Sequence, residues 1–180
     1  MIICVSGLHG TGKSTIARHL AKALDLKHYS TGDIFRTLAD ERNMDLEEFS
    51  AYAEDNKEID LELDAKIQAL AESGDNYIFD AQLCAYLLGE LADYCILLKC
   101  AQDVRIERMM ARDNKDKEKM VAETMAREQS ERQRFIDLYK IDILDGNLIL
   151  GTYDLILDVT HIGIDQVTAI AETAIRTALK

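Results

Sequence analysis

Proline is absent from the 180-residue sequence, and so is any long hydrophobic run. Without proline, every turn must be formed by glycine, asparagine, aspartate or serine, and no X-Pro isomerisation can slow folding. The apolar start, Met1 to Ser6, is too short for a secretory signal or a membrane span. With 48% hydrophobic and 30% charged residues, we expect one globular, cytoplasmic domain with a substantial core and no membrane partner.

Positive charge is scarce, since 21 Lys and Arg stand against 33 Asp and Glu and the net charge is −12. An acidic surface repels nucleic-acid polymers and anionic membranes, although a few local arginines can still bind a small nucleotide. Cysteine is also sparse, and no C-x-x-C pair occurs. Three of the four cysteines lie in apolar runs, so we expect buried structural thiols. The four positions are Cys4, Cys84, Cys95 and Cys100.

Apolar, β-rich runs alternate with helical patterns along the whole chain. Strands are expected at 2–5, 27–29, 77–79, 95–98 and 154–158. Helices are expected at 13–24, 32–41, 45–73, 83–91, 101–111, 119–140 and 164–179, with a charged, mobile segment at 112–119. This alternation predicts an α/β fold in which a five-stranded parallel sheet is covered by helices on both faces.

Between the first strand and the first helix stands Gly7-Leu8-His9-Gly10-Thr11-Gly12-Lys13-Ser14, which matches the P-loop pattern G-x-x-x-x-G-K-[ST]. The glycines allow backbone N–H groups to approach phosphate oxygens, and the helix start offers unpaired N–H groups to the anion. Lys13 supplies a charge for the β- and γ-phosphates of ATP, and the Ser14 hydroxyl is a ligand for Mg²⁺. The loop and the adjacent Thr15 are therefore predicted to bind ATP. His9 could act as a base, but a solvated loop side chain is the preferred interpretation.

A second polar cluster follows the second strand. Asp33 and Arg36 are three residues apart and share one helix face. The arginine could bind a phosphate there, and the carboxylate could accept hydrogen bonds from a sugar or base. An N-cap followed by an ordinary surface ion pair is an equally good interpretation of this cluster alone.

The third cluster is rich in arginine. Arg105, Arg108 and Arg112 share one face of a predicted helix, and Arg127 and Arg134 share one face of the next. Convergent cations stabilise the negative charge that phosphoryl transfer spreads over the migrating group. Acidic residues stand nearby, so a solvated face of surface salt bridges is the competing interpretation.

Taken together, these motifs make the chain resemble a nucleoside monophosphate kinase, most closely the short cytidylate kinases of archaeal type. The likeness runs nearly end to end. It rests on the P-loop, on His28-Tyr29-Ser30-Thr31-Gly32-Asp33-Ile34-Phe35-Arg36, on Leu46 to Glu54, on Val104-Arg105, Glu107-Arg108 and Arg112, on Arg127-Glu128, Ser130-Glu131, Arg134, Tyr139 and Ile141-Asp142, and on Leu157-Asp158-x-Thr160.

The resemblance implies a P-loop kinase fold in one domain, 1–180, with an acceptor-binding insertion at about 31–73 and a short lid at about 109–120. It implies transfer of phosphate from ATP, with Mg²⁺, to CMP and dCMP, by a monomer whose only partners are small nucleotides. Carried over by position, the acceptor would be bound by Thr31, Asp33, Arg36, Gln82 and Arg127, ATP would lie near Arg108 and Arg112, the adenine would border Thr160-His161, and Lys13, Arg108, Arg127 and Arg134 would be catalytic.

One segment departs from the family's pattern. After the third strand the family usually carries Glu-Gly-Arg-Leu, whereas this chain has Asp80-Ala81-Gln82-Leu83. The missing arginine is expected to hold the acceptor's phosphate, and a charged hydrogen bond worth about 1.5–3 kcal/mol corresponds to roughly a ten- to hundredfold change in rate. Two alternatives therefore stay open: a kinase for another acceptor such as AMP or UMP, and a non-catalytic P-loop regulatory protein.

Overall fold

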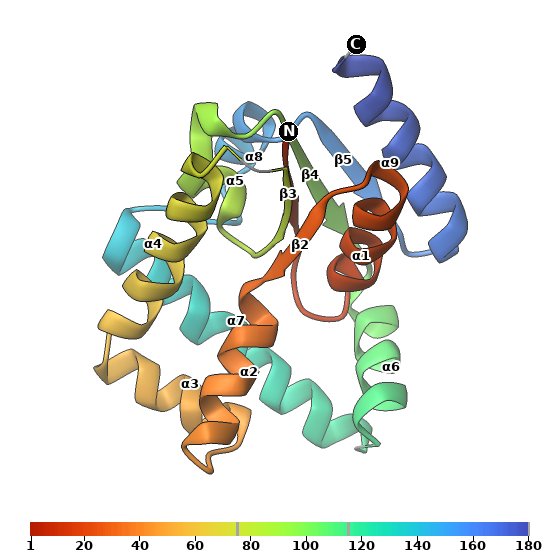
Figure 1. Ribbon diagram of the computed structural model, residues 1–180. Coiled ribbons are helices and arrows are strands. Elements are labelled where there is room, and N and C mark those ends of the chain that lie inside the picture. Colours follow the sequence, from red (N-terminus) through yellow and green to blue (C-terminus); the bar gives the residue numbers. More distant parts are fainter. Residues whose placement is uncertain (75, 115, 180) are drawn as a thin grey trace.

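A five-stranded parallel sheet lies at the centre of the computed structural model (Figure 1), with the strand order β2-β3-β1-β4-β5. The structure describes residues 1–74, 76–114 and 116–179. The strands are β1 Ile2–Ser6, β2 Lys27–Ser30, β3 Tyr77–Asp80, β4 Tyr94–Lys99 and β5 Leu155–Asp158. Each begins or ends within a residue or two of its expected position, so the predicted parallel α/β sheet is confirmed.

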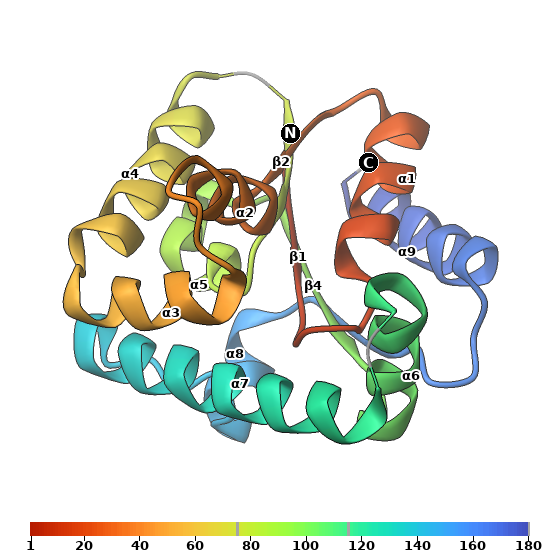
Figure 2. The same ribbon diagram turned by 90° about the horizontal axis from the view of Figure 1, so that it is seen from below.

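Helices cover both faces of the sheet (Figures 1 and 2), as the unbroken apolar run of β1 requires. Ile3 and Val5 pack with α1 Lys13–Leu24 and α9 Ile164–Ala178 on one face. Ile2 and Cys4 point the opposite way, into a second core cluster built with α4 Glu58–Glu72, α5 Cys84–Leu88 and α8 Gly146–Thr152. The alternation of side chains along β1 therefore supplies both halves of the core.

A third apolar cluster joins α2 Thr31–Glu41, α3 Leu46–Asp55 and the start of α4. Phe35 and Phe49 pack at its centre, with their ring centroids 4.6 Å apart. The sequence predicted continuous helix over 45–73, but the chain breaks between α3 and α4, where Asn56 caps the end of α3. The break lets α3 lie beside α7 while α4 turns back toward β3 (Figure 2).

The charged stretch at 112–119 is exposed at each of its described positions, as expected, and its two ends belong to helices that extend further than the sequence predicted. Arg112 and Asp113 end α6 Gln102–Asp113, and α7 Lys117–Tyr139 begins four residues later. The Asp116 side chain caps α7 by accepting from the Lys119 N–H at 2.9 Å. Residue 115, which the expected segment and lid both include, lies outside the described residues. Figure 2 shows α7 extending from α6 to α3.

Two shorter features also differ from expectation. The predicted helix at 83–91 is α5 followed by the 3-10 helix Gly89–Leu91, and α8 was not predicted at all. The Asp145 side chain caps the start of α8 by accepting from the Asn147 N–H at 2.8 Å. The two glycines within α8 obscure this helix in the sequence pattern. Three of the four cysteines are buried and all four are free thiols, as expected. Across the described ranges, no helix is long and apolar enough to span a bilayer.

Candidate active site

The loop between β1 and α1 has the backbone geometry of an anion site. Gly10 has φ +77°, and a Cβ there would lie 2.6 Å from the carbonyl oxygen of Arg105. Gly12 is the N-cap of α1 with φ +93° and makes no side-chain cap. The first turn of α1 contains no acidic residue, so no carboxylate of its own occupies the positive end of the helix dipole, which suits an anionic ligand.

The three arginines of α6 serve different purposes, although the sequence placed them on one face. Arg105 is 4% exposed and donates to the His9 carbonyl oxygen at 2.7 Å, which makes it a support behind the loop. Arg108 donates to the carbonyl oxygens of Thr11 (3.2 Å) and Val159 (3.0 Å). Arg112 is exposed and forms an ion pair with its neighbour Asp113. The solvated-face interpretation holds for the last of the three alone.

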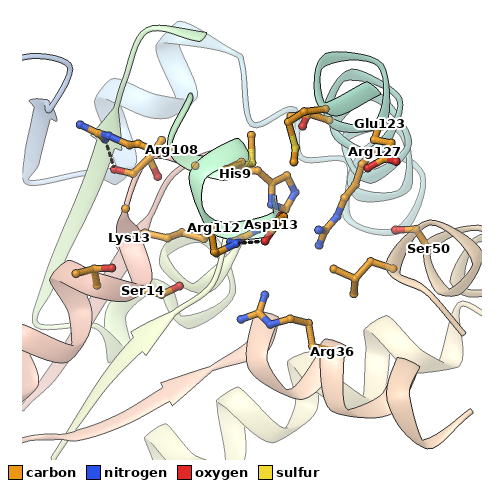
Figure 3. Close-up of a pocket in the computed structure, with 18 of the residues that line it drawn as sticks. His9, Lys13, Ser14, Arg36, Ser50, Arg108, Arg112, Asp113, Glu123 and Arg127 are labelled. Carbon is orange, nitrogen blue, oxygen red and sulfur yellow. Dashed lines mark hydrogen bonds and ion pairs between the residues drawn. The ribbon is translucent and has the colours of Figure 1, made fainter. Parts of the chain in front are cut away.

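A cavity of about 1280 Å³ lies between the loop, α3, α6, α7 and the start of α9 (Figure 3). Figure 3 shows the Arg36 and Arg127 guanidinium groups approaching the same space as Lys13, while Arg108 turns toward the loop. Val159 and the segment 162–164 line the cavity, whereas Thr160 and His161 are outside its lining. The predicted site residues that line this large cavity are His9, Gly10, Thr11, Gly12, Lys13, Ser14, Thr15, Arg36, Arg108, Arg112 and Arg127.

A second, smaller cavity of about 120 Å³ shares five lining residues with the large one: His9, Lys13, Ser14, Arg36 and Arg127. Fourteen further residues complete its lining, among them Thr31, Asp80, Gln82 and Arg134. The two cavities therefore meet at the lysine and serine of the loop. Asp33 lines neither cavity and forms an ion pair with Arg36, so the surface-pair interpretation describes that carboxylate.

Glu131 of α7 was missed as a site residue, and it ties the site together. Its buried carboxylate accepts from His9 Nε2 at 2.7 Å, Gln82 Nε2 at 2.7 Å and Arg127 Nε at 2.9 Å. Burial alone would raise the pKa of Glu131, but His9 and Arg127 outweigh it and hold that pKa well below its usual range. The expectation that His9 is a solvated loop side chain is wrong.

Gln82, the residue that replaces the family's arginine, is already committed to Glu131 through its amide nitrogen. Its Oε1 atom is buried and has no hydrogen-bond partner within the described part of the chain. A neutral amide therefore stands in the small cavity, and the arginines that line both cavities together with Lys13 are Arg36 and Arg127.

Asp80, at the end of β3, is a further residue that the sequence marked only as a strand end. It is 1% exposed and accepts from Ser30 Oγ at 3.0 Å. Burial would raise the pKa of Asp80, but His28 and Lys13 outweigh it, helped by Ser14, so the carboxylate stays ionised. Burial lowers the pKa of Lys13, an effect partly offset by Asp80. The sequence did indicate this role, because P-loop proteins usually carry the carboxylate that helps to hold magnesium at the end of a strand beside the P-loop strand.

Two carboxylates of α4 line the small cavity, and each accepts a hydrogen bond from a side chain of α7. Arg134 donates to Asp60 Oδ2 at 3.0 Å, and this guanidinium is 6% exposed. The Tyr139 hydroxyl donates to Asp64 Oδ2. Burial, with a smaller contribution from Asp60, raises the pKa of Asp64 to about 6, despite the hydrogen bond from Tyr139. Arg134 therefore braces α4 rather than projecting freely into the site.

Comparison with known proteins shows that this chain is similar to cytidylate kinases over nearly its whole length. The family model for the AAA domain matches residues 3–135. The cytidylate kinase of Methanocaldococcus jannaschii is 40% identical over 178 residues, with 97% of each chain covered, and that of Pyrobaculum neutrophilum is 39% identical over 180 residues, covering 100% of this chain and 95% of the relative.

Among solved structures, a gluconokinase from Sinorhizobium meliloti superposes with a TM-score of 0.63 at 16% identity, covering 98% of this chain and 93% of that chain. At that identity the match concerns the fold alone, and it is the fold of a P-loop kinase. The identity to the two cytidylate kinases, 40% and 39% over 97% and 95% of their lengths, is far higher. The chain therefore belongs to the archaeal cytidylate kinase family of nucleoside monophosphate kinases.

Proposed function

We propose that this protein transfers the γ-phosphoryl group of ATP to CMP or dCMP. The observation that carries the proposal is the pair of cavities meeting at Lys13 and Ser14, because phosphoryl transfer needs two nucleotides whose phosphates face each other. ATP occupies the large cavity with its phosphates on the loop, and the acceptor's phosphate occupies the small one. The names of the curated relatives support CMP as the acceptor.

The reaction needs no side-chain nucleophile. A phosphate oxygen of the acceptor attacks the γ-phosphorus, the bond to the β,γ-bridging oxygen breaks, and ADP leaves with the electron pair of that bond. Lys13 and the N–H groups at the start of α1 neutralise the charge on the β- and γ-phosphates. Arg127, fixed by Glu131, and Arg36 approach from the opposite side and hold the acceptor's phosphate.

The residues present fit Mg²⁺ beside the loop. Asp80 Oδ1 is buried and has no hydrogen-bond partner among the described residues, while the pKa of the same carboxyl is lowered by His28, Lys13 and Ser14. An oxygen-only set of a serine hydroxyl, a carboxylate and substrate phosphates suits this hard cation. We propose that Ser14 and Asp80 hold it, the latter through water. When bound, Mg²⁺ would neutralise charge on the β- and γ-phosphate oxygens.

Several finer assignments belong to the same proposal. Residues 31–73 form the acceptor-binding insertion and residues 109–120 the lid, in one domain that acts as a cytoplasmic monomer on small nucleotides. Arg108 positions the loop from the ATP side, with Arg112 near the cavity mouth. Arg134 acts through Asp60, and Asp33 acts by orienting Arg36. Thr31 and Gln82 complete the acceptor side.

The test is a phosphate-transfer assay with Mg-ATP and CMP, dCMP, UMP or AMP, beside a control without acceptor. We expect turnover with CMP and dCMP that exceeds turnover with UMP and AMP. Lys13→Ala should abolish it while leaving the fold intact by circular dichroism. If no monophosphate accelerates ATP consumption above the control, the kinase assignment fails and a non-catalytic nucleotide-binding role takes its place. Faster turnover with AMP or UMP would instead reassign the acceptor.

A further inference from the structure

The His9 side chain stands at the junction of the two cavities. Five residues line both of them, and four of these bind phosphates or the metal in the proposed reaction, namely Lys13, Ser14, Arg36 and Arg127. The fifth is His9, an imidazole from the loop that binds ATP, and it has no role in that reaction. Its side chain is only 15% exposed, so its contacts inside the protein decide what it does.

The imidazole ring is tied to Glu131 by a hydrogen bond of 2.7 Å between Nε2 and Oε2. Glu131 is ionised and can only accept, so the ring donates. Burial lowers the pKa of His9, although Glu131 opposes this, and the ring is therefore neutral at neutral pH with its single proton on Nε2. Gln82 donates to the same oxygen at 2.7 Å. Two neutral donors thus fix Oε2 and, with it, the orientation of the carboxylate.

The other oxygen of Glu131 orients Arg127. Arg127 Nε donates to Oε1 at 2.9 Å, which occupies the inner nitrogen of the guanidinium. The two terminal nitrogens have no hydrogen-bond partner within residues 1–74, 76–114 and 116–179. Figure 3 shows this end of Arg127 approaching the same space as Lys13 and Arg36. The terminal fork of the guanidinium can therefore bind a phosphate while Glu131 holds its base.

The backbone of His9 is anchored independently of the ring. Arg105 Nη1 donates to the His9 carbonyl oxygen at 2.7 Å, and Arg105 Nη2 donates to Glu128 at 3.3 Å. Glu128 stands three residues before Glu131 on α7, so the loop is attached to this helix at two points. Replacing the His9 side chain would remove one attachment and leave the other, and the loop backbone should then keep its course.

Resting on the proposed function, we infer that His9 is a positioning residue for the acceptor's phosphate, acting through Glu131 on Arg127. The ring holds one carboxylate oxygen so that the other directs the guanidinium into the small cavity. A side chain of the ATP loop thus serves the acceptor rather than the donor. Such alignment matters because phosphoryl transfer depends on positioning, and a misplacement of about 1 Å can cost roughly a hundredfold in rate.

The experiment measures equilibrium binding of CMP alone and of Mg-ATP alone by calorimetry, in the wild type and in His9→Leu. We expect the variant to bind CMP at least roughly tenfold more weakly, because the hydrogen bond that it loses is made to a charged group. Binding of ATP should change by less than about twofold, since Arg105 still holds the loop. His9→Gln should restore CMP binding, because its amide nitrogen can take the place of the imidazole Nε2.

His19→Leu is the matched control. It replaces the same residue type at an exposed position of α1 outside both cavities, and it should bind both nucleotides as the wild type does. A double-mutant cycle then separates positioning from direct contact. On an Arg127→Ala background, His9→Leu should change CMP affinity by less than about twofold, because the arginine that it positions is gone.

Four outcomes would overturn the inference: losses for His9→Leu and Arg127→Ala that multiply in the cycle, an ATP loss as large as the CMP loss, a glutamine variant no better than the leucine variant, or a wild type that binds no CMP. If His9→Leu does not fold by circular dichroism, His9→Asn replaces it, because its shorter amide does not extend to the position of Nε2. The expected binding results without turnover in the transfer assay would defeat the proposed function and leave this inference standing.

Discussion

Replacing Glu131 by glutamine should destabilise the protein far more than its position on a charged helix indicates. The wild-type carboxylate accepts from His9, Gln82 and Arg127, and its side chain is only 8% exposed. Glutamine keeps one acceptor oxygen but presents N–H donors to a site that already holds three donors. Breaking a buried ion pair by removing one partner costs about 3–5 kcal/mol. The retained oxygen places our expectation at the low end, about 3 kcal/mol.

The chain contains a matched control, because Arg176 and Glu172 form an ion pair with the same residue types four positions apart on α9. Here the Glu172 side chain is 31% exposed and its arginine partner 56%, against 8% and 23% for Glu131 and Arg127. Exposed helical pairs contribute about 0.3–0.5 kcal/mol. Since 1 kcal/mol shifts Tm by about 2–4 °C at this size, Glu131→Gln should lower Tm by about 6–12 °C and Glu172→Gln by about 1–2 °C.

The pH dependence of thermal stability provides a second measurement on the same variant. Because the pKa of Glu131 is lower in the folded protein than in the unfolded chain, its stabilisation is present above the unfolded pKa of about 4.3 and is lost as the pH falls through the folded pKa. The difference in Tm between wild type and variant should therefore be constant at neutral pH and shrink in acid. Equal Tm losses for the two glutamine variants, measured by circular dichroism, would refute the reasoning.

Three further outcomes are expected. Gly10→Ala should weaken ATP binding in a fluorescence titration at least roughly tenfold, because its Cβ would meet a backbone oxygen at 2.6 Å. Gly89→Ala, also at positive φ but in open space, should bind ATP normally in the same titration. Gln82→Arg should raise kcat/KM for CMP roughly tenfold in the transfer assay, since a charged hydrogen bond contributes about 1.5–3 kcal/mol; an unchanged or lower value would show that Arg36 and Arg127 already suffice. Asp64→Asn should raise the free energy of unfolding in urea by roughly 1–3 kcal/mol above about pH 6, because the raised folded pKa makes the wild-type carboxyl destabilising once it ionises. This gain should vanish below about pH 4, and a gain independent of pH would contradict the reasoning.

The sequence by itself determined the parts whose causes are local. The apolar run of β1, the glycines at 10 and 12 and the periodic face of α1 stand within some twenty residues, and each is legible because backbone sterics and helical spacing act over that range. The helix boundaries predicted from the sequence were wrong where the local signals for a turn or a cap were weak. The turn at Asn56 and the caps at Asp116 and Asp145 use ordinary polar residues, which the pattern did not separate from helix or exposed coil.

The tertiary structure alone decided which charged side chains serve the site. Glu131 meets His9 across 122 positions and Gln82 across 49, and no spacing rule relates residues so far apart. Nor could spacing separate Arg105, buried behind the loop, from Arg112, exposed to solvent on the same helix. Helical periodicity fixes which residues share a face, whereas burial and partners depend on what other elements pack against that face.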